Sequence, residues 1–434
     1  MIQELQNVFK ITELKRRLLI TFGLLAAYRV GAHVPTPGID GEALAQFFNQ
    51  VQGTLLGLVD LFSGGNLRRL TIFALGIMPY ISASIILQLL TVVIPALERL
   101  AKEGEAGRKK ITQYTRYGTI LLSAIQSFGI ALGLEGMQSP GGAAIVPLPG
   151  WGFRLLTILT LTTGTALIMW LGEQISEKGV GNGISLIIFA GIVVRLPSAV
   201  VATYQLLATG ELKPFVLGFI ALVMIGVTAA VVLTQEGQRK IPVQYAKRVV
   251  GRRVYGGQAT HIPLRVNTAG VIPVIFASSI IILPATMARF IPHPWMQAIA
   301  DALSPGRLIY TVLYAGFIIF FAYFYTAIVF NPNDLADNMK RYGGFIPGVR
   351  PGKKTAEHID HVLTRITLPG AFFLAMISIL PDFLIRWFNV PFYFGGTSLL
   401  IVVGVALDTV RQMESHLLMR HYEGFLRRRA KVRA

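Results

Sequence analysis

Two histidines late in the chain are the residues whose spacing comes closest to a metal site. His358 and His361 lie three positions apart with Asp360 between them, so one helix turn could present both imidazoles to a metal ion. No third ligand is apparent, which favours the solvated face of a helix instead. The chain has no cysteine, and this excludes thiol catalysis, disulfides and Cys-ligated zinc. We expect no bound metal and no cofactor.

Two glycine-containing stretches could be mistaken for phosphate-binding or catalytic loops. Residues 348–355 read GVRPGKKT, with three residues between the glycines where a phosphate-binding loop has four. Residues 179–183 read GVGNG, which predicts a turn that opens the next helix at Asn182. No Ser/His/Asp set is identifiable either. The sequence therefore predicts that the protein is not an enzyme.

The composition predicts a membrane protein that crosses the bilayer many times. Of the 434 residues, 53% are hydrophobic and only 14% are charged, against about a quarter in soluble proteins. Apolar runs of the roughly 20 residues that a spanning helix needs recur along the chain. We expect ten spans, at residues 18–34, 71–95, 115–134, 154–172, 184–207, 214–234, 268–290, 308–330, 366–386 and 398–413.

The basic residues alternate from one connection between spans to the next. Lysines and arginines gather before the first span, in the second, sixth and eighth connections, and after the last span, whereas the odd connections are nearly bare. The positive-inside rule then places both termini and the even connections in the cytoplasm. Two of these connections, 235–266 and 331–365, are longer than orientation requires. They carry function or are solvated loops that only set the topology.

The spans contain few ionisable residues, and Arg29 and Asp408 are the main exceptions. A pump or an ion-coupled carrier would normally bury carboxylates or histidines along its pathway. Their scarcity argues against transport of that kind. A small-solute carrier remains the alternative function at this point.

A short apolar run comes directly before the second span. It extends from Leu55 to Phe62, is too short to cross a bilayer, and stops at Ser63-Gly64-Gly65. Glycine permits the backbone break that the change of direction requires. Such a run either lies at the membrane surface or is held at membrane depth inside the protein, where it lines a cavity.

Several stretches resemble the SecY family of protein-conducting channels. They are IFALGIMPYISASIILQLL (72–90), GTALIMWLGEQISEKGVGNGISLIIFAGIV (164–193), GVIPVIFASSII (270–281), NPNDLADNMKRYGGFIPGVRPG (331–352) and VPFYFGGTSLLIVV (390–403). The resemblance covers nearly the whole chain. It implies an all-α polytopic fold of ten transmembrane helices in two pseudo-symmetric halves, 1–212 and 213–434, packed as a clamshell around an hourglass pore.

The resemblance also implies a function. Such a channel moves unfolded secretory polypeptides across the bacterial cytoplasmic membrane, releases transmembrane segments sideways into the lipid, and has no catalysis of its own. The motor ATPase SecA or the translating ribosome drives it. SecE and SecG are the expected small subunits, and SecDF and YidC are further partners that the resemblance suggests.

Matching motif positions give the expected site residues, each of which has a plainer alternative reading. The isoleucines singly would be core residues, the polar residues helix–helix contacts, and the basic residues topology charges. A plug helix is expected at about 55–67. The pore ring falls on Ile77, Ile81, Ile188, Ile275 and Ile401. The plug falls on Leu55, Leu56, Gly57, Leu58, Val59, Asp60, Leu61, Phe62, Ser63, Gly64 and Gly65. The lateral gate falls on Ser82, Gln126 and Asn267, and the SecA or ribosome docking site on Arg239, Lys240, Lys247, Arg248, Arg252, Arg253, Arg350 and Lys353.

Overall fold

The computed structural model describes most of the chain. The described residues are 11–50, 60, 63–137, 139, 142–210, 213–245, 248–250, 253–255, 259–290, 294–304, 306–388 and 396–433. Some expected site residues lie outside them, namely Leu55, Leu56, Gly57, Leu58, Val59, Leu61, Phe62, Lys247 and Arg252. Arg248 and Arg253 are described by their backbone only.

The chain forms two compact units that each draw on separate parts of the sequence. Unit 1 contains Met1–Ala208, Ser279–Tyr310 and Val405–Ala434. Unit 2 contains Thr209–Ser278 and Thr311–Gly404. Three chain segments build the first unit and two build the second, so the chain passes between them repeatedly. The expected halves at 1–212 and 213–434 stay a prediction.

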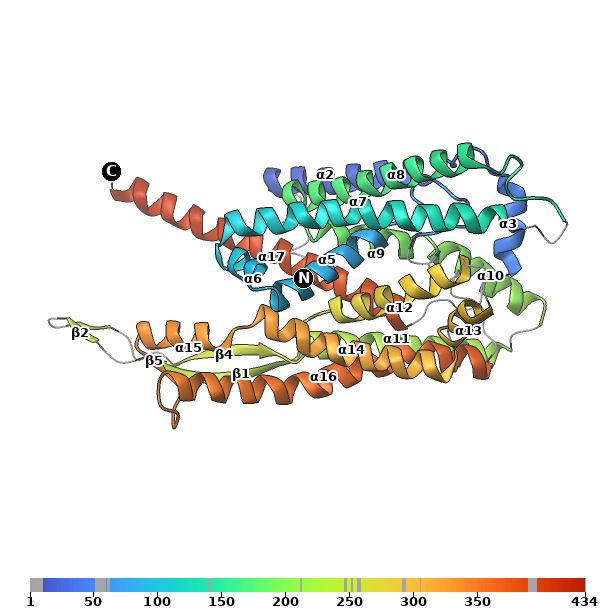
Figure 1. Cartoon of the computed structure of the whole chain (residues 1–434). Helices are drawn as coiled ribbons and strands as arrows, with labels where there is room; N and C mark the ends of the chain where they lie inside the picture. The colour runs from blue at the N-terminus through green and yellow to red at the C-terminus, as the bar shows by residue number, and fades with distance from the viewer. Residues whose placement is uncertain are drawn as a thin grey trace. The chain divides into compact units, whose positions relative to one another are not determined.

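Unit 1 is helical in its described part (Figure 1). Its elements are α2 (Thr12–Gly31), α3 (Gly41–Gln50), α5 (Met78–Val93), α6 (Pro95–Lys102), α7 (Glu105–Glu135), α8 (Trp151–Lys178), α9 (Gly183–Val193), α10 (Leu196–Ala208) and α13 (Pro294–Ala302), with parts of α12, α14 and α17. Helices α5, α7 and α8 pack against one another, and α8 also packs on α2 and α9. Close packing of α8 depends on Gly164, where a Cβ atom would lie 1.8 Å from the carbonyl oxygen of Ile72.

The second span begins later than the sequence predicts. Residues 71–77 form turns, and the helix begins at Met78 instead of residue 71. Gly76 has a φ of +57°, which a right-handed helix excludes, and Pro79 then occupies the first turn of α5, a position that proline favours. At its other end α5 stops at Ile94, and α6 leaves at an angle of 100°. Pro95 begins α6 at this corner.

The spans of unit 2 are long apolar helices. They are α11 (Pro214–Glu236), most of α14 (Leu308–Val329) and α16 (Lys353–Phe388), with the first turns of α12 (Ile272–Phe290) and of α17 (Gly396–Arg433). Aromatic rings join α12 to α14, because Phe276 meets both Phe321 and Tyr325 edge to face at 5.8 and 6.3 Å. Such pairs add roughly 0.5–1.5 kcal/mol beyond area burial.

A small α/β platform stands at one end of unit 2, in the two connections that the sequence predicts as loops. Strand β1 (Gln238–Tyr245) pairs antiparallel with both β4 (Ala259–Arg265) and β5 (Gly344–Phe345). A second ribbon joins β2 (Arg248–Val250) to β3 (Arg253–Tyr255). Helix α15 (Pro332–Arg341) and the first turns of α16 lie beside β1 and β4 (Figure 1). We call β1, β4, β5, α15 and residues 346–366 the platform.

The platform has its own apolar core. Alternate residues of β1 are buried, as a half-covered strand requires. They pack with residues of β4, α15 and α16 in one cluster, whose fully buried members are Ile241, Val243, Leu264, Met339, Ile346 and Ile359. Asn331 caps α15 by accepting a hydrogen bond from the Asn333 amide at 3.1 Å. The platform is therefore a folded body and not a flexible connection.

Each of the ten expected spans coincides with a helix or a closely spaced helix pair. In the described part of the chain, six helices are long and apolar enough to cross a membrane, or seven if α5 and α6 count as one bent span. The remaining three expected spans correspond to α2, α12 and α17. The predicted turn at 179–183 is confirmed, because the Asn182 side chain accepts hydrogen bonds from the amides of Ile184 and Ser185 at the start of α9.

Candidate functional site

A tight buried turn follows the short apolar run in unit 1. Gly64 and Gly65 both have positive φ, and the Gly65 amide donates to the Asp60 carbonyl at 2.8 Å. The Ser63 hydroxyl donates to the same carbonyl at 3.0 Å. Gly64 lies so close to α9 that a Cβ atom there would stand 2.9 Å from the Cα of Gly191. The turn therefore requires glycine for its conformation and for its packing.

Tyr28 of α2 ties this turn to the helices around it. Its hydroxyl donates to the Ser63 carbonyl at 3.3 Å and accepts from the Asn66 side-chain amide at 3.2 Å. Its ring stacks on Phe73 with 5.5 Å between centroids. Tyr28 is 2% exposed and Asn66 is 1% exposed, so these polar groups satisfy each other away from solvent.

An ion pair ties the same turn to the junction of α9 and α10. Asp60 is buried, and its carboxylate pairs with the guanidinium of Arg195. The other carboxylate oxygen accepts from the Arg68 amide at 2.9 Å. Burial lowers the pKa of Arg68, against the opposing effect of Asp60, and the charges of Arg195 and Arg69 lower it further.

The five expected ring isoleucines are all buried. Ile77 and Ile81 lie at the start of α5 and Ile188 lies in α9, within unit 1. Ile275 of α12 and Ile401 of α17 belong to unit 2. Burial of this kind fits core isoleucines as well as a constriction, so the ring stays a prediction.

The expected gate residues occupy three different elements. Ser82 is buried in α5, and Gln126 is half-buried in α7, which packs against α5. Asn267 lies in the turn before α12, where its side-chain amide donates to the Gly270 carbonyl at 2.9 Å. That bond fixes the local turn, and the gate role of the three stays a prediction.

Arg350 lies exposed in a rigid turn between β5 and α16. Gly348 and Gly352 on either side have φ of +81° and +98°. The buried hydroxyl of Thr355 donates to the Arg350 carbonyl at 2.9 Å. Val349, directly before it, packs against the platform core. The backbone of Arg350 is therefore fixed while its guanidinium faces solvent.

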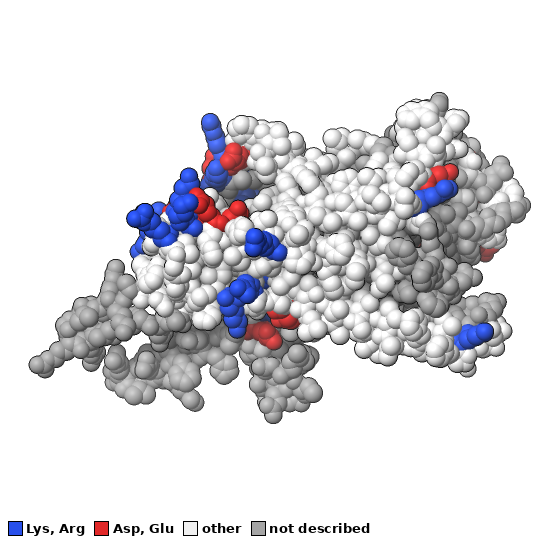
Figure 2. Space-filling view, turned by 90° about the horizontal axis from the view of Figure 1, so that it is seen from below, with Lys and Arg blue, Asp and Glu red and all other residues white. Residues whose placement is uncertain are grey.

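The other described basic residues of the expected docking site are also exposed. Arg239 and Lys240 lie on β1, and Lys353 begins α16. On the face that Figure 2 shows, the lysines and arginines lie in a few small groups, and most of the other described surface is uncharged. This distribution suits an apolar body that sits in a bilayer and presents its charges to water.

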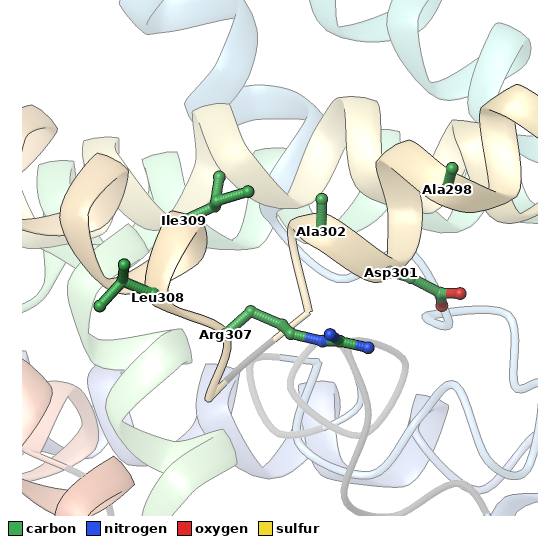
Figure 3. A pocket seen from close by; sticks show the side chains of 6 residues that line it. All are labelled: Ala298, Asp301, Ala302, Arg307, Leu308 and Ile309. Carbon is green, nitrogen blue, oxygen red and sulfur yellow. The ribbon is translucent and has the colours of Figure 1, made fainter.

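The two histidines lie on the solvent-facing side of α16. His358, Asp360 and His361 are all exposed, which confirms the interpretation as a solvated helix face. Among the described residues no three His, Asp or Glu side chains gather as metal ligands would. A cavity of about 520 Å³ lies where α13 ends and α14 begins, lined by Ala298, Asp301, Ala302, Arg307, Leu308 and Ile309 (Figure 3).

Sequence reasoning missed two features that the structure brings to the site. Arg195 is a single charge inside the expected span 184–207, and Asp60 is a single acid in an apolar run. Two isolated opposite charges of this kind, each in an apolar segment, were a signal for a pair. The strands of the platform also have a signal, since apolar Ile241, Val243 and Tyr245 alternate with polar or exposed residues.

The long apolar helices and the exposed charged platform define a polytopic α-helical membrane protein. A model of the SecY family matches residues 71–410, and the chain belongs to that family. It is 48% identical over 429 residues to protein translocase subunit SecY of Aquifex aeolicus (strain VF5), covering 99% of this chain and 100% of that protein. It is 53% identical over 420 residues to protein translocase subunit SecY of Escherichia coli (strain K12), covering 96% and 94%.

Solved structures share the fold. One described as a protein conducting channel has a TM-score of 0.65 at 17% identity and covers 92% of each chain. A SecY structure concerned with the plug domain has a TM-score of 0.65 at 19% identity, again covering 92% of each chain. Sec61 in the canine ribosome–channel complex has a TM-score of 0.60 at 17% identity, with the same coverage. At these identities the likeness shows the fold.

Proposed function

We propose that the chain is the pore subunit of a bacterial protein-conducting channel. It moves unfolded secretory polypeptides across the cytoplasmic membrane and releases transmembrane segments sideways into the lipid. One observation carries the proposal: the chain aligns with SecY relatives at about half identity along almost its whole length. The protein supplies a path and no chemistry, and SecA or the translating ribosome supplies the driving force.

The described elements support particular roles. The buried isoleucines Ile77, Ile81, Ile188, Ile275 and Ile401 form the constriction. An apolar constriction excludes ions by dewetting, and side chains without fixed bonds part for any polypeptide sequence. The segment 55–65 is the plug, and its described turn is held by Tyr28 and Arg195. Ser82, Gln126 and Asn267 lie along a gate whose polar contacts, at about 1 kcal/mol each, a signal helix can displace.

The platform is the docking site for the partners that drive transport. Its exposed arginines suit both a carboxylate of SecA and the phosphates of ribosomal RNA, because a guanidinium binds either with two parallel hydrogen bonds. The positive-inside rule places this platform and both termini in the cytoplasm. SecE and SecG complete the channel, and SecDF and YidC are accessory partners.

Reconstitution tests this function. The purified chain with SecE and SecG in lipid vesicles should take up a precursor with an intact signal sequence when SecA and ATP are present. Vesicles without the chain, and vesicles without ATP, are the controls. Uptake no greater than in these controls would overturn the proposal. Uptake of small solutes by the chain, without any precursor uptake, would support the alternative of a carrier.

A further inference from the structure

The Asp60–Arg195 pair is the one charged contact between the described plug turn and the α9–α10 junction. Asp60 has a side chain that is 6% exposed, and that of Arg195 is 24% exposed. Besides its carboxylate contact, the Arg195 guanidinium donates to the Asp60 carbonyl at 3.2 Å. One arginine thus holds both the side chain and the backbone of Asp60. Because the contact is largely removed from water, replacing either residue is costly, since the other charge is then left without its partner.

Arg195 is itself held rigidly. It lies between the last residue of α9, Val193, and the first of α10, Leu196. Its amide donates to the Ile192 carbonyl at 3.1 Å, and its carbonyl accepts from the Ala199 amide at 3.0 Å and from the Ser198 hydroxyl at 2.9 Å. The helix break therefore presents the guanidinium from a fixed backbone. A fixed donor positions its partner better than a mobile one does.

The charges around this contact are unbalanced. Arg68 and Arg69 follow the glycine turn, and Arg68 interacts electrostatically with Asp60, Arg195 and Arg69. Asp60 is therefore the acid beside two guanidinium groups, those of Arg195 and Arg68, and Arg69 adds a further positive charge near Arg68. Neutralising Asp60 would leave these like charges unbalanced, and the repulsion between Arg68 and Arg195 would push the turn away from the junction.

We propose that Arg195 is a positioning residue that latches the plug turn to the α9–α10 junction and thereby sets how readily the channel opens without a proper signal sequence. This inference rests on the proposed function. Tyr28 and the glycines give the turn its shape, and the ion pair gives it a contact that can be released. A client that opens the channel must supply the energy that separates Asp60 from Arg195.

The test compares Arg195→Gln, Asp60→Asn and the double variant with a matched control. Arg154→Gln is that control, because Arg154 and Glu135 form an ion pair of similar exposure, 25% and 10%, at 2.6 Å in the same unit. Each purified channel is reconstituted into vesicles, and two quantities are measured. They are the salt leak without precursor, and the uptake of a signal-defective precursor relative to an intact one.

We expect both single variants to raise the leak and the relative uptake by at least about tenfold, since they break a buried pair. Arg154→Gln should stay at the parental level, although it removes a similar pair. The double variant should leak no more than the worse single variant, because the two residues act on one contact. The latch would be overturned if the leak of the double variant equalled the sum of the two single effects. It would also be overturned if Arg195→Gln and Arg154→Gln gave the same leak and the same relative uptake.

Parental uptake of the intact precursor separates this proposal from the proposed function. If the parent takes up that precursor and the variants match it in leak and selectivity, only the latch fails. If the parent takes up no precursor, the function fails as well. Should Arg195→Gln not insert, Arg195→Lys and Arg154→Lys replace it and its control. A greater salt leak from Arg195→Lys than from Arg154→Lys then supports the latch, and an equal leak from the two variants overturns it.

Discussion

At the scale of single residues, the same side-chain type has different consequences in different settings. Arg195 is half-buried against a carboxylate and holds a turn, whereas Arg350 is exposed on a rigid turn of its own. The first arginine acts inside the chain, and the second is available to a partner. Exposure and the backbone around each residue, more than its charge, indicate which role it has.

Arg350→Glu should abolish most SecA-driven uptake while leaving expression and membrane insertion intact. Substitutions at exposed loop positions usually change stability by less than about 0.5 kcal/mol, and the fixed backbone of this turn does not depend on the side chain. Reversal of the charge removes a bidentate contact and adds repulsion. Arg350→Lys should be intermediate, since an ammonium keeps the charge but not the planar fork.

ATP-dependent uptake of a purified precursor into vesicles measures this effect. Lys353→Glu is the matched control, because it reverses a charge three residues away on the same platform. We expect it to reduce uptake less than Arg350→Glu. Parental uptake by Arg350→Glu would mean that this arginine only sets topology.

Replacing Ile81 and Ile275 together by asparagine should make the closed channel leak ions. Two amides would hydrate a constriction that is dry when lined by isoleucine. The salt leak of reconstituted vesicles is the measurement, and the corresponding double leucine variant, which stays apolar, is the control. If the asparagine variant folds, translocates precursor and leaks no more than the parent, these residues do not line the constriction.

At the scale of elements, the platform has its own core at the end of a bundle of spans. Its buried cluster draws on β1, β4, α15 and α16, so the turn that contains Arg350 is only as rigid as this cluster. Ile359 is the cluster residue that best tests this dependence, since it is fully buried in α16 near the turn.

Ile359→Ala should loosen the platform without removing any span. The loss of a buried isoleucine costs roughly 2–5 kcal/mol because of the cavity that remains. Amide hydrogen exchange should become faster in β1 and β4 while the helices of unit 1 keep their protection. Asp360→Ala, at the exposed neighbouring position, is the control. Unchanged exchange in both strands would show that the platform does not depend on this cluster.

At the scale of the whole molecule, the alternation of charge predicts which side each connection faces. The platform and the connection between α7 and α8 should lie on opposite sides of the membrane. The chain has no cysteine, so single cysteines can be introduced without a background. Leu148 and Tyr342 are suitable positions, since they are 83% and 78% exposed.

A membrane-impermeant thiol reagent added outside intact cells should label Leu148→Cys and spare Tyr342→Cys. Tyr342→Cys should become labelled once the cells are opened, which controls for the reactivity of the site. Labelling of Tyr342→Cys from outside, with Leu148→Cys protected, would reverse the proposed orientation of the whole chain.

The sequence was sufficient for the helices because hydrophobic length alone specifies a span. Runs of about 20 apolar residues locate spans to within a few residues. The exception is the start of the second span, where Gly76 and Pro79 move the helix start to Met78. Local backbone chemistry outweighs hydropathy there, and residues 73–77 are buried in turns instead.

The contacts between distant segments could not be read in the same way. The isolated charges of Asp60 and Arg195 indicate that each needs a partner, but the sequence does not show that the two, 135 positions apart, pair with each other. The platform is a related case. The alternation of apolar residues along β1 is a signal for a strand, but it does not show that α15 and α16 cover the buried face. Pairings of this kind depend on topology, whereas span positions depend on local composition.

The buried cluster of the platform also has a consequence for the order of events during synthesis. Ile241 of β1 and Ile359 of α16 share this core but lie about 120 residues apart in the chain. The hairpin of β1 and β4 is complete at Arg265, about 94 residues before Ile359, so at a synthesis rate of about 5–20 residues per second it waits roughly 5–19 s for the helix that covers it. An uncovered hairpin is only marginally stable. The turn with Arg350 therefore becomes fixed only after α11, α12 and α14 have been made, so an unfinished chain presents no complete docking surface.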